Sequence, residues 1–266
     1  MADPGEVVVA GDWHGDLHAA GSAVMAAAAR GVPVVVQVGD FGLWSGAGGQ
    51  AFLDGLSKVA VRGGVQVLWL DGNHEDFDLL EGFPVDAGSG LRPVRDNVTH
   101  VPRGSRWEWA GLRFAAVGGA TSLDVAGRTP GRSWWAQEAL TARQAEEVVA
   151  GGGCDVLLCH DCPEGVPIPG IDRASSLRRW PESALRAAWA HRELLAAVAA
   201  ELGPTHVFHG HFHVRYTATV DLWGGHPTVV AGLGDQSGVL AQSNRVLVRL
   251  DALAAESALL AGGGRP

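Results

Sequence analysis

The sequence predicts an α/β fold in which buried strands alternate with helices along the chain. Short apolar runs rich in valine occur at residues 6–10, 32–38 and 65–70, and helical patterns separate them at 17–30 and 51–61. Short continuous apolar runs are typical of strands buried on both faces, and helical crossovers join such strands in parallel. The first half of the chain therefore indicates a parallel sheet covered by helices.

The second half continues this alternation with shorter elements. Strands are expected at 98–101, 105–109 and 112–117, followed by a helix over 141–150 with Thr141 as its N-cap. The later predictions are a strand at 155–159, a proline-rich loop at 163–181, a helix at 182–202, and strands at 205–208, 214–222, 227–231 and 245–250. No repeat or linker-like charge run divides the sequence. One domain is expected over 1–251, with a C-terminal turn and flexible tail at 252–266.

Composition places the chain among ordinary globular proteins. Of its 266 residues 47% are apolar and 18% charged, and no apolar stretch is long enough to span a membrane. The formal net charge of −9 argues against extended nucleic acid as a partner, although two divalent ions would reverse the sign locally. Three cysteines cannot pair completely, and the N-terminus lacks a basic signal-peptide region, so a cytoplasmic location is expected.

Five short polar clusters carry the chemical information, because each follows an apolar run predicted to be a strand. They are Gly11-Asp12-Trp13-His14-Gly15, Gly39-Asp40, Gly72-Asn73-His74-Glu75, Cys159-His160-Asp161 and Gly210-His211-Phe212-His213. Each cluster alone has an ordinary explanation: Gly-Asp is a common turn pair, and a lone histidine is more often a core residue. Their order and their shared place at strand ends favour a site with two metal ions, which need mixed nitrogen and oxygen ligands and one shared carboxylate.

These motifs resemble the calcineurin-like metallophosphoesterase superfamily, whose pattern is D-x-H, G-D, G-N-H-[ED], H and G-H-x-H. The resemblance runs from Gly11 to His213 and into the closing strands. It implies a four-layer α-β-β-α sandwich of two mixed sheets. It also implies two metal ions as cofactors, divalent or trivalent, drawn from manganese, iron and zinc.

The resemblance also assigns roles to individual residues. Asp12, His14 and His213 would hold one ion, Asn73, His160 and His211 would hold the other, and Asp40 would bridge them. His74 would be the catalytic histidine, which hydrogen-bonds the phosphate and protonates the leaving oxygen.

One departure from the family pattern concerns His74. Many members read G-D-x-x-D, and the second aspartate orients the catalytic histidine, whereas this chain has Leu43 at that position. Asp71, Glu75 or Asp76 would have to substitute, or a backbone carbonyl would hold the ring. The protein-phosphatase branch places an arginine next, where this chain has Trp44, so a protein phosphatase is disfavoured.

A Gly-rich segment outside the pattern is a candidate for substrate contacts. It begins at Gly118 and carries Asp124, Arg128 and the pair Trp134-Trp135. Guanidinium groups bind phosphate well, so Arg128 and Asp124 are candidate substrate-binding residues. The two tryptophans are interpreted as core residues beneath this segment.

The sequence therefore predicts a dinuclear-metal phosphoesterase that acts on a small-molecule phosphomonoester or phosphodiester, with nucleotide-like substrates favoured, by attack of a metal-bridging hydroxide. A nuclease would need a basic track beyond the cleft. A non-catalytic binding scaffold remains a further alternative, although such relatives typically lose ligands and here every matched position is intact.

Overall fold

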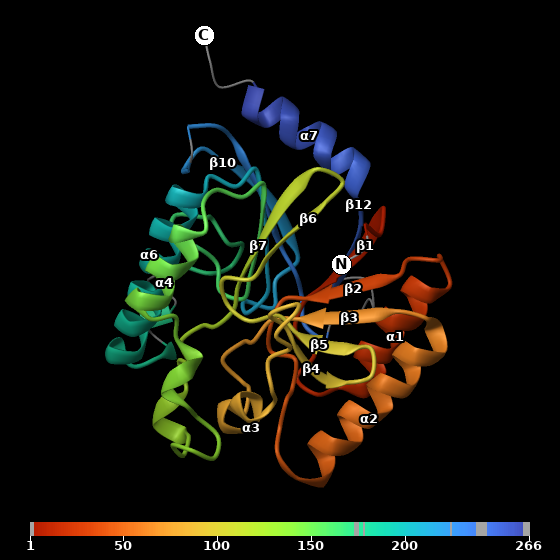
Figure 1. Ribbon diagram of the computed structural model, residues 1–266. Helices are drawn as coiled ribbons and strands as arrows, with labels where there is room; N and C mark the ends of the chain where they lie inside the picture. Colours follow the sequence, from red (N-terminus) through yellow and green to blue (C-terminus); the bar gives the residue numbers. More distant parts are fainter. Residues whose placement is uncertain (1–2, 173–175, 178, 224, 238–243, 263–266) are drawn as a thin grey trace.

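The computed structural model describes residues 3–172, 176–177, 179–223, 225–237 and 244–262. Within these residues the strands form two six-stranded sheets (Figure 1). The first sheet has the order β12 (Arg245–Arg249), β1 (Glu6–Ala10), β2 (Val34–Gln37), β3 (Gln66–Trp69), β5 (Val98–His100) and β4 (Arg92–Arg95). The second has the order β10 (Tyr216–Val220), β11 (Thr228–Gly232), β9 (His206–His209), β8 (Val156–Cys159), β7 (Leu112–Val117) and β6 (Arg106–Trp109).

The two sheets share one plan, in which parallel central strands are flanked by antiparallel edge strands. In the first sheet β1, β2, β3 and β5 are parallel, and β12 and β4 pair antiparallel at the edges. In the second sheet β11, β9, β8 and β7 are parallel, and β10 and β6 form the antiparallel edges. Both sheets are therefore mixed. In each sheet the parallel strands point the same way, so their carboxyl ends lie together at one end of the sheet.

Helices cover the outer faces of the sheets. Figure 1 shows α1 (Leu17–Ala28) and α2 (Gly46–Gly63) beside the first sheet, and α4 (Ala142–Ala150) and α6 (Glu182–Leu202) beside the second. The N-cap of α4 is Thr141, as predicted, and its side chain forms a reciprocal capping box with Gln144. No described helix is both long and apolar enough to cross a membrane.

Three apolar layers hold the sheets and helices together. Because side chains alternate along a strand, Val7 and Val9 of β1 enter the core between the sheets, while Val8 packs beneath α1 and α2. In β8, Leu158 faces the same central core and Leu157 packs beneath α4 and α6. This three-layer core confirms the predicted four-layer α-β-β-α sandwich of two mixed sheets.

Some elements differ from the sequence predictions. The helix expected at 51–61 begins earlier, at Gly46, because glycines in its first turns obscure the helical pattern. The structure adds a short helix, α3 (Phe77–Gly82), and the edge strand β4, neither of which was predicted. The expected C-terminal turn is a 13-residue helix, α7 (Leu250–Gly262), anchored by buried Leu250 and Leu253. Residues 263–266 of the predicted tail lie outside the described residues.

Candidate dinuclear metal centre

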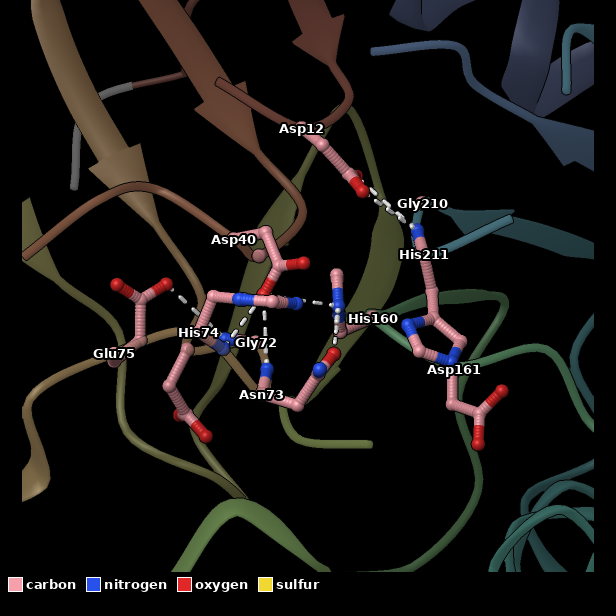
Figure 2. Close-up of polar contacts among 12 residues, drawn as sticks. Asp12, Asp40, Gly72, Asn73, His74, Glu75, His160, Asp161, Gly210 and His211 are labelled. Atoms are coloured by element: carbon pink, nitrogen blue, oxygen red, sulfur yellow. Dashed lines mark hydrogen bonds and ion pairs between the residues drawn. The ribbon is translucent and has the colours of Figure 1, made fainter. Parts of the chain in front are cut away.

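The predicted site residues come together where parallel strands of both sheets end. The segments after β1, β2 and β3 carry Asp12, Asp40 and Asn73, and those after β8 and β9 carry His160 and His211 (Figure 2). Because the two sheets pack face to face, side chains from distant parts of the sequence face one another across the sandwich. The carboxyl ends of parallel strands are the usual position for ligand sites in α/β folds.

A first group contains Asp12, His14, Asp40 and His213. One potential ligand atom from each of these residues lies within 4.8 Å of the others. Nε2 of His14 is 3.2 Å from an Asp40 carboxylate oxygen, and Nε2 of His213 is 3.0 Å from an Asp12 carboxylate oxygen. The group thus offers two carboxylates and two imidazoles around one point, which is a suitable ligand set for a transition-metal ion.

A second group contains Asp40, His160 and His211, within the same 4.8 Å limit. Nε2 of His160 lies 3.4 Å from Asp40 Oδ1 and 3.2 Å from the side-chain oxygen of Asn73. Asn73 therefore borders this group as a further oxygen donor. Asp40 belongs to both groups, and its carboxylate contacts both His160 and the turn that carries Asn73 (Figure 2).

Backbone amides hold the two buried carboxylates in place. The N–H groups of Asn73 and His74 both donate to Asp40 Oδ1 at 2.9 Å. The N–H of His211 lies 3.1 Å from each carboxylate oxygen of Asp12. Since Asp12 and Asp40 are almost fully buried, these donors offset part of the cost of burying charge and fix which way the free oxygens point.

The backbone is strained at the site. Of six non-glycine residues with positive φ among the described residues, four are His14, Asp40, His211 and His213, with φ between 43° and 66°. A left-handed conformation costs a side-chain-bearing residue about 1 kcal/mol or more, so it persists only where the surrounding structure imposes it. Its concentration in these four residues indicates a functional site.

Glycines beside the site provide space for neighbouring functional groups. A Cβ atom on Gly72 would lie 2.1 Å from Asp40 Oδ1, and one on Gly210 would lie 2.2 Å from Asp12 Oδ1. Any larger residue at these positions would displace a carboxylate. Glycine is therefore required before Asn73 and before His211, because a carboxylate lies directly against the backbone at both positions.

The charges at the centre favour cations. Burial alone would lower the pKa of His160 and of His14, but the Asp40 carboxylate outweighs it and raises them to about 10 and about 9. Burial would raise the pKa of Asp40, yet His160 and His14 hold it well below its ordinary value. Burial lowers the pKa of His211 to about 4, which leaves a neutral imidazole. The ionised Asp40 carboxylate favours the protonated, positively charged form of the histidines beside it. The same negative charge would stabilise bound metal ions.

His74 contacts Arg128, and Leu43 stands where the resemblance led us to expect an orienting aspartate. One guanidinium nitrogen of Arg128 lies 2.9 Å from Nδ1 and 2.8 Å from Nε2 of His74, and Arg128 Nε lies 2.8 Å from Asp124. Burial lowers the pKa of His74, and Arg128 lowers it further against the opposite effect of Asp40. The candidate substrate-binding pair therefore lies beside the candidate catalytic histidine.

The three carboxylates considered as substitutes for that aspartate have other partners. Glu75 accepts hydrogen bonds from the N–H groups of Phe41, Gly42 and Leu43, and so ties down the turn after Asp40. Asp71 pairs with Arg103 and His100, and Asp76 caps α3. The backbone carbonyl of His74 accepts the indole N–H of Trp44 at 2.6 Å.

The sequence interpretation missed two side chains that contact Nδ1 of candidate histidine ligands. Asp235 lies 3.3 Å from Nδ1 of His213, and the side-chain oxygen of Gln236 lies 2.9 Å from Nδ1 of His14. Both follow β11 through Gly234, which repeats the strand–glycine–aspartate pattern of Gly39-Asp40. That repetition is the signal that would have identified them.

The fold and the site together define a metal-dependent hydrolase, with histidine-rich groups from both sheets around a shared carboxylate. The family profile described as "Calcineurin-like phosphoesterase" matches residues 5–215, and the chain therefore belongs to this family. It is accordingly a metal-dependent phosphoester hydrolase, in a family that depends on a dinuclear metal centre.

Solved structures show the same fold. The protein TT1561 of Thermus thermophilus aligns with a TM-score of 0.55 and 14% identity, covering 93% of this chain and 95% of the other. A dimetal phosphatase from Danio rerio aligns with a TM-score of 0.55 and 13% identity, covering 92% of each chain. No curated protein sequence matches the chain significantly.

Proposed function

We propose that the chain hydrolyses a small phosphomonoester or phosphodiester at this centre. Asp12, His14 and His213 would hold one cation, Asn73, His160 and His211 would hold the second, and Asp40 would bridge them. The observation that carries the proposal is the place of the buried Asp40 carboxylate in both ligand groups. Two bound cations supply a deprotonated water as nucleophile and neutralise charge on the phosphoryl oxygens. The mixed nitrogen and oxygen donors suit manganese, iron or zinc.

His74 and Arg128 are proposed to act on the phosphate itself. His74 donates a hydrogen bond to the phosphate and delivers a proton to the leaving oxygen as the ester bond breaks. Arg128 binds phosphoryl oxygens through its guanidinium, which Asp124 holds at 2.8 Å. Once a phosphate lies between them, both groups have an anionic partner in place of their contact with each other.

Nucleotide-like small molecules are the favoured substrates. The net charge of −9 argues against a polymeric nucleic acid, which would need a basic track on the surface. Leu43 and Trp44 stand where the protein-phosphatase branch has an aspartate and an arginine, which disfavours phosphoprotein substrates. We also propose that residues 1–251 act as one catalytic domain, and that the protein works in the cytoplasm, where its buried free cysteines remain reduced.

Turnover of a nitrophenyl phosphate monoester and of the corresponding bis-ester by the manganese-loaded protein tests the function. A monoesterase spares the bis-ester, whereas a phosphodiesterase hydrolyses it. His74→Asn should lose most activity on esters with poor leaving groups, because these need the proton most. An absence of turnover with manganese, iron and zinc alike would refute the enzymatic function, and retention of DNA that falls with salt would favour a nuclease.

A further inference from the structure

A pocket of about 370 Å³ adjoins His74 and Arg128, and the proposed chemistry leaves it unused. Besides these two residues it is lined by Trp44, Ser45, Asp76, Arg132, Ser133 and Trp135. We call this cavity the Trp44 pocket. It opens directly next to the histidine that is proposed to face the leaving group.

Trp44 forms an exposed but fixed wall of the pocket. It is 40% exposed, although an indole of this size normally lies in the core. Its Nε1 donates to the carbonyl oxygen of His74 at 2.6 Å, and its ring packs so closely on Gly15 that a Cβ there would lie 3.0 Å from it. The indole is therefore held between two segments of the site and presents a flat surface before any ligand binds.

Two further kinds of residue line the pocket, a buried tryptophan and exposed polar side chains. Trp135 is buried and belongs to the core beneath α1 and α2, so it forms a rigid floor. Arg132, Ser45 and Ser133 are exposed at the rim and offer hydrogen-bonding groups. A flat apolar wall with polar groups at its rim matches a ring system that carries polar substituents.

We propose that the Trp44 pocket binds the leaving group of the ester, and that this leaving group is a planar aromatic ring with polar substituents, stacked on Trp44. The inference rests on the proposed function, because His74 must face the oxygen to which it gives a proton. The organic group attached to that oxygen therefore lies on the His74 side of the phosphate.

A second aromatic pocket, of about 260 Å³, is the main competitor. It borders His211 and is lined in part by Trp180 and Phe212. His211 is a proposed metal ligand, so its nitrogen is engaged and cannot serve the leaving oxygen. The proton requirement therefore favours the Trp44 pocket.

The test compares benzyl phosphate with cyclohexylmethyl phosphate, two monoesters of primary alcohols that differ mainly in the planarity of the ring. For Trp44→Leu the ratio of kcat/KM between them should fall by roughly three- to tenfold, as expected for the loss of one aromatic stacking contact. Trp44→Phe, which keeps a flat ring, should retain most of the preference. Trp180→Leu is the matched control and should leave the ratio unchanged.

Binding of benzylphosphonate, measured by calorimetry, gives a readout that does not require turnover, and its affinity should fall in Trp44→Leu. An unchanged ratio and affinity in Trp44→Leu would overturn the pocket assignment while leaving the enzymatic function intact. A loss of preference in Trp180→Leu alone would move the leaving group to the second pocket. If no phosphoester is hydrolysed at all, the proposed function fails, and the inference fails with it.

Discussion

Nδ1 of His160 lies 2.9 Å from the carbonyl oxygen of Val38, a hydrogen bond that joins the second sheet to the first at the candidate metal centre. A carbonyl oxygen only accepts, so Nδ1 donates, and Nε2 is the ring nitrogen that faces the oxygens of Asp40 and Asn73. Metal-binding histidines commonly donate their second ring nitrogen in this way, which fixes both tautomer and orientation. The contacts that His14 and His213 make through Nδ1 follow the same design.

Asp40→Asn should abolish binding of both metal ions. The amide keeps the size of the side chain but removes the charge shared by the two ligand groups, and one of its two donor oxygens becomes an NH₂ group. We expect kcat/KM to fall by more than about 100-fold, with bound metal measured by elemental analysis falling in parallel. Asp54→Asn, which changes an exposed carboxylate paired with Arg95, is the control. Full metal content in Asp40→Asn would contradict the bridging role.

Gly210→Ala should impair the site without unfolding the protein. The new Cβ would lie 2.2 Å from Asp12 Oδ1, so the carboxylate must move away from its amide donor and from His213. We expect weaker metal binding and a large loss of turnover. Gly48→Ala is the matched control: no atom lies within 4 Å of its new Cβ in α2, and replacement of a helical glycine stabilises by up to about 1 kcal/mol. Equal activity in the two variants would refute this steric argument.

Asp235→Asn should weaken the hold on the first metal ion through His213. Asp235 lies 3.3 Å from Nδ1 of that histidine, and a carboxylate in this position orients the ring and raises its basicity. Loss of such a partner typically costs about 10- to 100-fold in metal affinity. Metal titration followed by calorimetry measures the change. The matched substitution Asp221→Asn alters an exposed carboxylate and should leave the affinity as it is.

Much of the site could be predicted from the sequence because strand ends and motif order constrain it. Asp12, Asp40 and His160 follow short apolar runs, and the topology brings the ends of those strands together whatever the details of packing. The contact between Arg128 and His74 could not be predicted in this way. It depends on the path of the Gly118–Trp135 segment, which has little regular structure and hence no periodic pattern.

The fold class was predicted correctly, and only individual helices and strands were missed or misplaced. The first turns of α2 contain several glycines, which are poor helix formers, yet packing of the helix against α1 and the sheet stabilises them. The terminal segment 252–266 was predicted as a turn and a tail because it ends in a glycine-rich run. Burial of Leu250 and Leu253 against the central core is enough to fix the helix α7.

Stability should decrease in mild acid partly because of His206. This histidine of β9 is buried, and burial lowers its pKa below 6.5 even though Glu256, 3.4 Å away, raises it. Below pH 6.5 the unfolded chain therefore binds a proton that the folded chain does not. The contribution of neutral His206 to the free energy of unfolding is fully present above pH 6.5. It is lost as the pH falls toward the folded-state pKa, and the free energy of unfolding then decreases by at most about 1.4 kcal/mol per pH unit.

Urea unfolding of wild type and His206→Gln between pH 5 and 8 isolates this contribution, since the other histidines titrate in both proteins. The difference in unfolding free energy between them should change below pH 6.5, with wild type losing more stability per pH unit than the variant. Glu256→Gln should have the opposite effect to His206→Gln. It removes the charge that raises the pKa of His206, so the protein should lose more stability in acid than wild type does. Parallel pH profiles for all three proteins would show that His206 binds its proton equally in the folded and unfolded states.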